Sequence, residues 1–281
     1  MIWKPALLVV FMAIQPLIIK EMPICYSCLA QPSIPNSHAI PRSFFKNISR
    51  KDSGKLIVIT DGPNLARKSG DNSASHILCG KCEKQFDVKF DRIAIDAVRA
   101  IISAHNSGKK EITLDNWTAV CRSLASIFWR CSKSKSEFYG AFRPNPAFEG
   151  LLEADWRGNG ELGLSYKMDP LVDPTPIAAG GFSARSLELF LMAPRLFSVS
   201  HGYRGRTKNG IGTILLMGGV VVTAFAPRQS KTRERRSGYV QANGKLPLKG
   251  ANMWEIPFLK EFLVQAVRKE QIAESTTAIT S

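Results

Sequence analysis

The sequence predicts an α+β fold whose N-terminal part is organised by cysteines. Two Cys-x-x-Cys pairs lie at residues 25–28 and 79–82. Short apolar segments between the pairs favour a β-hairpin, and apolar residues at helical spacing follow the second pair. A third apolar run, at residues 211–225, carries two central glycines and favours buried strands. We therefore expect a zinc-bound treble clef (a knuckle, a β-hairpin and a helix), followed by a helix and a mixed α/β C-terminal region.

The composition indicates a globular protein with a polyanionic partner. The chain has 281 residues, enough for one large domain or two modest ones, and 44% of them are hydrophobic. Lys and Arg total 38 against 23 acidic residues, which gives a net charge of +15 and a pI near 9.7. Such a balance favours nucleic acid or an anionic membrane face. The alternative is a merely basic surface.

The cysteine pattern predicts a structural metal site. Four of the six cysteines form the two pairs, and this usage indicates zinc in a reducing compartment rather than disulfides. Zn²⁺ prefers four thiolate or imidazole ligands, and Cys25, Cys28, Cys79 and Cys82 would fill all four positions. A redox dithiol is the rival interpretation, but no thioredoxin-like βαβ pattern surrounds either pair. The remaining Cys121 and Cys131 fit small buried hydrophobes.

Residues 1–21 leave the cellular location open. Their apolar run at 5–19, with a possible cleavage site after Ala30, is typical of a signal peptide and of an exported or membrane-anchored protein. The run is short for a membrane span of about 20 residues. Cleavage after Ala30 would also remove the first cysteine pair. We therefore favour Met22 as the working start, with a cytoplasmic protein, no membrane contact and residues 1–21 as an upstream extension or apolar leader.

The segment between the cysteine pairs is expected to form a small hairpin. Residues 43–48 fit a turn of helix, 55–60 a strand, 64–75 a polar loop and 75–78 a short return strand. From the second pair onward the apolar period becomes helical, which predicts a helix over residues 80–105. The second pair would then sit at the N-terminus of this helix.

The rest of the chain is predicted from shorter signals. We expect a helix over residues 114–131 with Asp115 as its N-cap, and a hairpin at 211–225. Less regular candidates follow: strands at 162–168, 187–192 and 196–201, a basic loop at 227–238 and an amphipathic helix at 254–268. The expected domains are 22–108, the zinc-bound part, and 109–281, an α+β region of unknown role.

Three strings carry a resemblance to a known family. They are CYSC from Cys25, NSHAIPRSF from Asn36 and LCGKCEKQF from Leu78. In this order they resemble the HNH endonucleases, in which a Cys-x-x-Cys pair, an Asp-His-x-x-Pro string and a second pair with a histidine follow one another. They are closer still to an uncharacterised bacterial group with Ser-His-x-Ile-Pro, a second pair followed by Glu, and a later Ser-x-x-Trp-Arg string, here residues 126–130.

The resemblance implies an active site. His38 matches the general base that takes a proton from the attacking water, beside a catalytic Mg²⁺ or Mn²⁺. Glu83 stands where the final metal-binding histidine is expected, and a carboxylate can hold such a cation. Ser37 replaces the usual acidic ligand and no asparagine falls cleanly at the middle position, so His76 is the candidate substitute ligand. The alternatives are a structural His38, a half-buried strand histidine at 76, and a Glu83 favoured by the helix dipole.

Two functions compete on these residues. The first is a metal-dependent HNH-type endonuclease that hydrolyses DNA phosphodiester bonds. The second is a non-catalytic, zinc-dependent nucleic-acid-binding protein, which Ser37 and Glu83 favour. In both, basic side chains near the histidine and in the 227–238 loop are expected to contact phosphates: Arg42, Lys46, Lys84, Arg228, Lys231, Arg233, Arg235 and Arg236. The alternative for the 227–238 loop is a solvated loop without such contacts.

Overall fold

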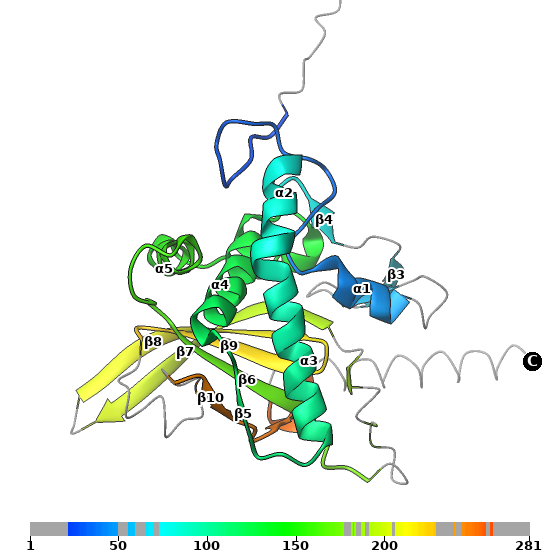
Figure 1. The fold of residues 1–281 in the computed structure, drawn as a ribbon, viewed down its shortest axis with the longest axis vertical. Coiled ribbons are helices and arrows are strands. Elements are labelled where there is room, and N and C mark those ends of the chain that lie inside the picture. The colour runs from blue at the N-terminus through cyan, green and yellow to red at the C-terminus, as the bar shows by residue number, and fades with distance from the viewer. Residues whose placement is uncertain are drawn as a thin grey trace, which may run out of the picture.

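The protein is a mixed α+β structure, as expected from the sequence (Figure 1). The computed structural model describes residues 22–49, 56–59, 66–69, 73–176, 181, 183, 187–188, 191–203, 206–228, 239, 243–256 and 259–260. The apolar leader at 1–21, most of the basic loop at 227–238 and most of the helix expected at 254–268 lie outside these residues.

The N-terminal part contains two small antiparallel strand pairs. β1 (Ser37–His38) pairs with β4 (Ala74–Ser75), and α1 (Arg42–Ser49) follows β1. The expected strand at 55–60 is confirmed as β2 (Leu56–Ile59), paired with β3 (Ala66–Ser69).

Two expectations for this hairpin region are wrong. The polar loop expected at 64–75 contains β3 and β4, because strand pairing is decided by backbone partners as well as by apolar side chains. The return strand expected at 75–78 stops at Ser75. Beyond it the backbone bonds to the knuckle instead: the Tyr26 N–H donates to the Ile77 carbonyl (3.0 Å) and the Ile34 N–H to the Leu78 carbonyl (2.9 Å).

A continuous helix follows the second cysteine pair. It comprises α2 (Gly80–Phe86), a π-helical turn η1 (Asp87–Asp91) and α3 (Arg92–Asn106), so the helix predicted at 80–105 is confirmed. Cys79 is its N-cap, and the Cys79 sulfur accepts a hydrogen bond from the Cys82 N–H at 3.5 Å. The π-helical turn was not predicted, and such turns are frequent at functional sites.

Two further helices follow: α4 packs beside the long helix, and α5 packs against α4 (Figure 1). α4 (Trp117–Lys133) confirms the helix predicted at 114–131, but its N-cap is Asn116 rather than Asp115, because Asn116 takes a left-handed conformation (φ 50°) and accepts from the Ala119 N–H. α5 (Pro146–Arg157) was not predicted, and the 3₁₀ turn η2 (Glu137–Tyr139) precedes it.

A five-stranded sheet forms most of the C-terminal part, in the order β11-β6-β9-β8-β7. β7, β8, β9 and β6 pair antiparallel, and β11 adds to β6 in parallel. The bounds of these and the remaining short elements are β5 (Glu111–Thr113), β6 (Ser165–Val172), β7 (Leu191–Tyr203), β8 (Arg206–Met217), β9 (Val220–Ala226), β10 (Lys245–Pro247), β11 (Ala251–Asn252) and η4 (Met253–Glu255).

The structure confirms some of the strands predicted for this sheet and corrects others. The hairpin at 211–225 is confirmed, with Gly218 (φ 58°) and Gly219 (φ 77°) forming its turn. The strand expected at 196–201 lies within β7, and the strand expected at 162–168 begins later, at Ser165. The strand expected at 187–192 is wrong at residues 187–188, which are not extended.

One buried cluster joins the segment that carries the four paired cysteines to the sheet. It includes three of the paired cysteines, the inner faces of α3 and α4, and side chains of β6, β8 and β9. The β8–β9 turn reaches α1 and α3, since a Cβ at Gly218 would lie 2.8 Å from the Phe44 ring and 3.1 Å from Val98. None of the helices in the described part of the chain combines the length and the apolar character that a bilayer span requires.

Candidate metal centre and histidine pocket

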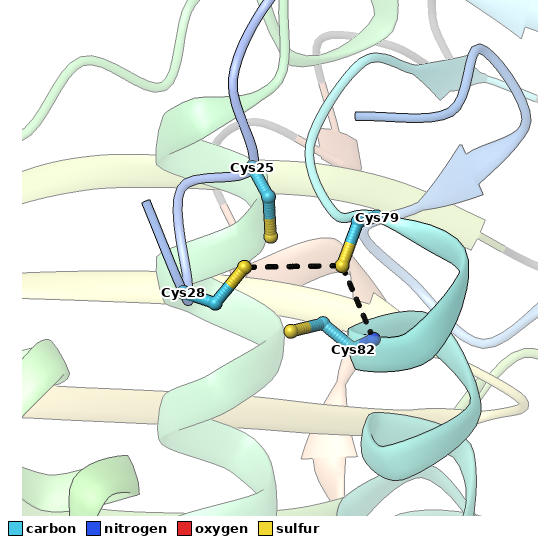
Figure 2. A group of neighbouring side chains, drawn as sticks. All are labelled: Cys25, Cys28, Cys79 and Cys82. Atoms are coloured by element: carbon cyan, nitrogen blue, oxygen red, sulfur yellow. Dashed lines mark hydrogen bonds between the residues drawn. The ribbon is translucent and has the colours of Figure 1, made fainter. Parts of the chain in front are cut away.

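The four paired cysteines converge on one point, as Figure 2 shows. The sulfur atoms of Cys25, Cys28, Cys79 and Cys82 all lie within 4.8 Å of one another, and the Cys28–Cys79 sulfur distance is 3.9 Å. Four thiolates at about 2.3 Å from a tetrahedral zinc are separated from one another by about 3.8 Å. The cluster could therefore hold a zinc ion, and all four ligands would come from the protein.

The knuckle around the first pair is a tight hydrogen-bonded turn. The Leu29 N–H donates to the Cys25 carbonyl at 2.9 Å, and Leu29 itself has a positive φ of 56°. The backbone N–H groups of Ala30 and Gln31 donate to the Cys28 sulfur, and mainly through Ala30 they lower the pKa of Cys28 to about 6. These donors favour a thiolate, which is the form that binds a metal.

The second pair is held by the start of α2. Burial, followed by a hydrogen bond with Cys79, raises the pKa of Cys82 to about 12. A buried thiol of this kind is deprotonated when it coordinates a cation, and its proton passes to the solvent. Metal binding would therefore release protons, and we expect it to weaken as the pH falls.

His38 lies on β1 with its backbone held from two sides. Its N–H donates to Glu83 Oε1 at 3.2 Å, and its carbonyl accepts from Arg130 Nη1 at 2.9 Å. The neighbouring Ser37 hydroxyl donates to Glu83 Oε2 at 2.7 Å and accepts from the Leu78 N–H at 3.2 Å. Helices α2 and α4 thus fix the strand that carries the histidine.

The His38 ring lines a pocket and keeps one nitrogen unpaired. Only 7% of His38 is exposed, and its Nε2 is buried without a hydrogen-bond partner. Burial lowers the pKa of His38 against the opposing charge of Glu83, so the ring is neutral at pH 7 and can accept a proton. The pocket has a volume of about 480 Å³ and is lined by Asn36, His38, Pro41, Arg42, Ser43, Glu83, Lys84, Asp87, Asp91 and Ile95.

Acidic side chains from one helix form part of the pocket wall. Glu83, Asp87 and Asp91 are spaced four residues apart along α2 and η1. Both Glu83 oxygens accept hydrogen bonds from β1, and Asp91 pairs with Arg130. Asp87 is more open: it lies 3.5 Å from the Arg92 guanidinium, and both side chains are largely exposed.

The structure separates the three candidate catalytic residues. His38 and Glu83 come together, but His76 does not line their pocket. Its Nδ1 lies 3.3 Å from both the hydroxyl and the carbonyl oxygen of Ser33, on the loop behind the knuckle. These contacts favour the alternative of a half-buried structural histidine at position 76 over a metal ligand beside His38.

The expected nucleic-acid contacts fall in three groups. Arg42 and Lys84 line the pocket, and Lys46 is exposed on α1. Arg228 instead donates to the Leu162 carbonyl at 3.1 Å, which ties the end of β9 to the start of β6. The remaining four basic residues of the loop lie outside the described part of the chain: Lys231, Arg233, Arg235 and Arg236.

Two charged residues of the site were not assigned from the residues alone. Arg130 is fully buried in α4 and Asp91 is 8% exposed in η1. A signal existed for Arg130, because it stands within the apolar string Ile127-Phe-Trp-Arg130-Cys131 and a charge there needs a buried partner. Nothing in the sequence identified Asp91 as that partner.

Comparison with known proteins adds no assignment: no family model, curated protein or solved structure matches the chain.

Proposed function

We propose that the protein is a metal-dependent endonuclease of HNH type that hydrolyses DNA phosphodiester bonds on a zinc-stabilised treble-clef scaffold. The observation that carries this proposal is the environment of His38. Its backbone is held on both sides, it lines a pocket that also contains Arg42 and Lys84, and its Nε2 is buried without a hydrogen-bond partner. Several buried side-chain polar atoms in the described part of the chain lack a partner, and two of them, His38 Nε2 and Ser43 Oγ, belong to residues that line this pocket, where a bound ligand could satisfy them. The net charge of +15 suits a polyanionic substrate.

In this mechanism neutral His38 acts as the general base. Its Nε2 takes a proton from water as the water oxygen bonds to phosphorus, and the opposite phosphorus–oxygen ester bond breaks. The leaving oxygen takes up a proton, so the products are a phosphomonoester and an alcohol. Arg42 and Lys84 would stabilise the phosphate charge. A base of this kind typically contributes about 10²- to 10⁴-fold in rate.

The catalytic Mg²⁺ or Mn²⁺ would be held on the acidic wall of the pocket. Asp87 is open, and within the described part of the chain each Glu83 oxygen accepts one hydrogen bond, which leaves it a further lone pair. Mg²⁺ commonly uses one or two carboxylates together with substrate phosphate and water. The bound cation would neutralise charge that develops on the phosphate.

A non-catalytic nucleic-acid-binding protein is the second candidate. The observation that favours it is the double hydrogen bonding of Glu83, which ties α2 to β1 and gives this carboxylate a structural use. Ser37 takes part in the same contact, where an acidic ligand would be expected. In this case the pocket binds phosphate without cleaving it.

A plasmid-nicking assay with Mg²⁺ or Mn²⁺ tests the proposal. We expect the wild-type protein to nick supercoiled DNA and His38→Ala to lose about 100-fold or more. His105→Ala is the matched control, since His105 lies near the end of α3 and does not line the pocket. Activity that survives His38→Ala would refute the mechanism. Zinc-dependent binding of labelled DNA without any cleavage would establish the second candidate.

We also propose that translation starts at Met22 and that the protein is cytoplasmic, with DNA as its partner. N-terminal sequencing of the protein isolated from its host tests the start site. A mature N-terminus after Ala30 would favour export instead and would exclude a four-cysteine zinc site in the mature chain.

A further inference from the structure

Arg130 is the most deeply buried charged residue of the site. It belongs to α4, 92 positions from His38, and none of its side chain is exposed. Arginine is almost never fully buried without a partner. Its contacts therefore indicate why the protein keeps a charge there.

The nitrogens of the Arg130 guanidinium donate to acceptors on three different residues. Nη1 donates to the His38 carbonyl at 2.9 Å and to Asp91 Oδ2 at 3.3 Å, and Nη2 donates to Asp91 Oδ1. Nε lies 3.4 Å from the Ser126 carbonyl, and the guanidinium carbon lies 5.4 Å from the centre of the Phe86 ring. All three guanidinium nitrogens donate, and lysine could not reproduce this planar pattern.

Stability alone does not explain this arrangement. Burial disfavours the guanidinium charge, but Asp91, with smaller contributions from Glu83 and Cys131, opposes burial, and the pKa of Arg130 is raised. Replacing a buried ion pair with well-packed apolar side chains is often neutral or stabilising. A retained pair therefore points to a positional role. Among the hydrogen bonds of the described residues, the His38 carbonyl is the backbone acceptor that Arg130 reaches outside its own helix.

We propose that Arg130 and Asp91 form a positioning pair that fixes His38 in the pocket. Asp91 is the last residue of the π-helical turn η1, and it orients the guanidinium from the helix that also carries Glu83. Glu83 holds the N–H side of His38 and Arg130 holds its carbonyl side, so the peptide on each side of the ring is restrained. Arg130 is absent from the pocket lining and acts through His38.

The purpose of this positioning rests on the proposed function, but the positioning itself does not. Arg130→Lys tests it, with Arg99→Lys as the matched control, because Arg99 forms an exposed pair with Asp96 on the same long helix as Asp91. The first readout is the ¹H–¹³C signal of the His38 ring at fixed neutral pH, assigned by its loss in His38→Gln. Zinc content and the unfolding midpoint report on the fold.

We expect Arg130→Lys to retain zinc while the His38 signal shifts or broadens, and Arg99→Lys to leave it unchanged. For DNA cleavage we expect kcat to fall about 10- to 100-fold with KM within about twofold, since small displacements of a catalytic group have effects of this size. An unchanged His38 signal in folded Arg130→Lys would overturn the proposal.

Asp91→Asn provides a second variant if Arg130→Lys does not fold. Its amide oxygen still accepts from the guanidinium but carries no charge, so we expect a smaller change of the His38 signal in the same direction. An unchanged signal in this variant overturns the proposal. If the wild-type protein cleaves no DNA, the proposed function fails, and the ring signal still decides whether Arg130 positions His38.

Discussion

Replacing Cys28 with serine tests the metal centre with little disturbance of packing. Cys28 is the exposed member of the cluster, whereas the other three cysteine ligands are buried. Its substitution therefore leaves the apolar core in place and removes one ligand. Any large effect must come from the metal rather than from a cavity.

The size of the effect follows from the number of ligands. Structural zinc sites contribute roughly 10–16 kcal/mol at neutral pH. If the four thiolates share this equally, one ligand is worth about 2.5–4 kcal/mol, which is about a 100- to 1000-fold loss of zinc affinity. A loss of that size is comparable to a large part of the net stability of an ordinary domain, about 5–15 kcal/mol.

Zinc affinity can be measured by competition with a chromophoric chelator, and unfolding by tryptophan fluorescence. Trp129 and Trp156 are suitable reporters because both rings contact Phe86, which lies on the helix that Cys79 caps. We expect chelation to shift their emission to the red at lower denaturant in Cys28→Ser than in the wild-type protein.

Cys121→Ser is the matched control for this experiment. It also removes a thiol, but Cys121 is buried in α4, outside the cluster, so zinc stoichiometry should remain at one per chain. Two results would refute the reasoning: less than half an equivalent of zinc in the wild-type protein, or wild-type zinc affinity in Cys28→Ser.

Three further predictions concern buried polar groups. Burial lowers the pKa of His38, so this histidine is protonated at a higher pH in the unfolded chain than in the folded protein. The free energy of unfolding should therefore fall as the pH drops below about 6.5, and it should fall less in His38→Gln. Urea unfolding at several pH values measures this. Asp91→Ala should reduce the free energy of unfolding by about 3–5 kcal/mol because Arg130 is left buried and unpaired, as urea titration would show. Tyr166→Phe should cost about 1–2 kcal/mol by removing a 2.7 Å hydrogen bond to buried Asp155, and an unchanged unfolding midpoint would contradict it.

The elements with a strong local period were predictable. The helix after Cys79 has apolar residues at helical spacing over many turns, and its packing in the structure follows that pattern. The β8–β9 hairpin was predictable because Gly218 and Gly219 interrupt an apolar run at a turn that needs positive φ. The convergence of the four cysteines followed from their spacing and the coordination preference of zinc.

Other features were not predicted, and some of them depend on contacts that no local pattern encodes. α5 had sequence signals that were overlooked, namely Asn145 as N-cap, Pro146 in the first turn and Gly158 at the C-cap. The predicted N-cap of α4 was one residue too early, because Asn116, not Asp115, adopts the left-handed conformation and caps the helix. The ion pair of Arg130 with Asp91 joins residues 39 positions apart, and only the folded chain shows it.

The candidate site is completed by residues beyond the segment that carries the four paired cysteines. The boundary expected at residue 108 stays a prediction, yet Arg130, which holds the His38 carbonyl and pairs with Asp91, lies after it. Without α4, Asp91 would lose its buried partner, and the Phe86 ring would lose its stacking on Trp129. Zinc can therefore fix the knuckle and the start of α2, but the position of His38 in its pocket also requires a helix that the cysteine and histidine motifs do not include.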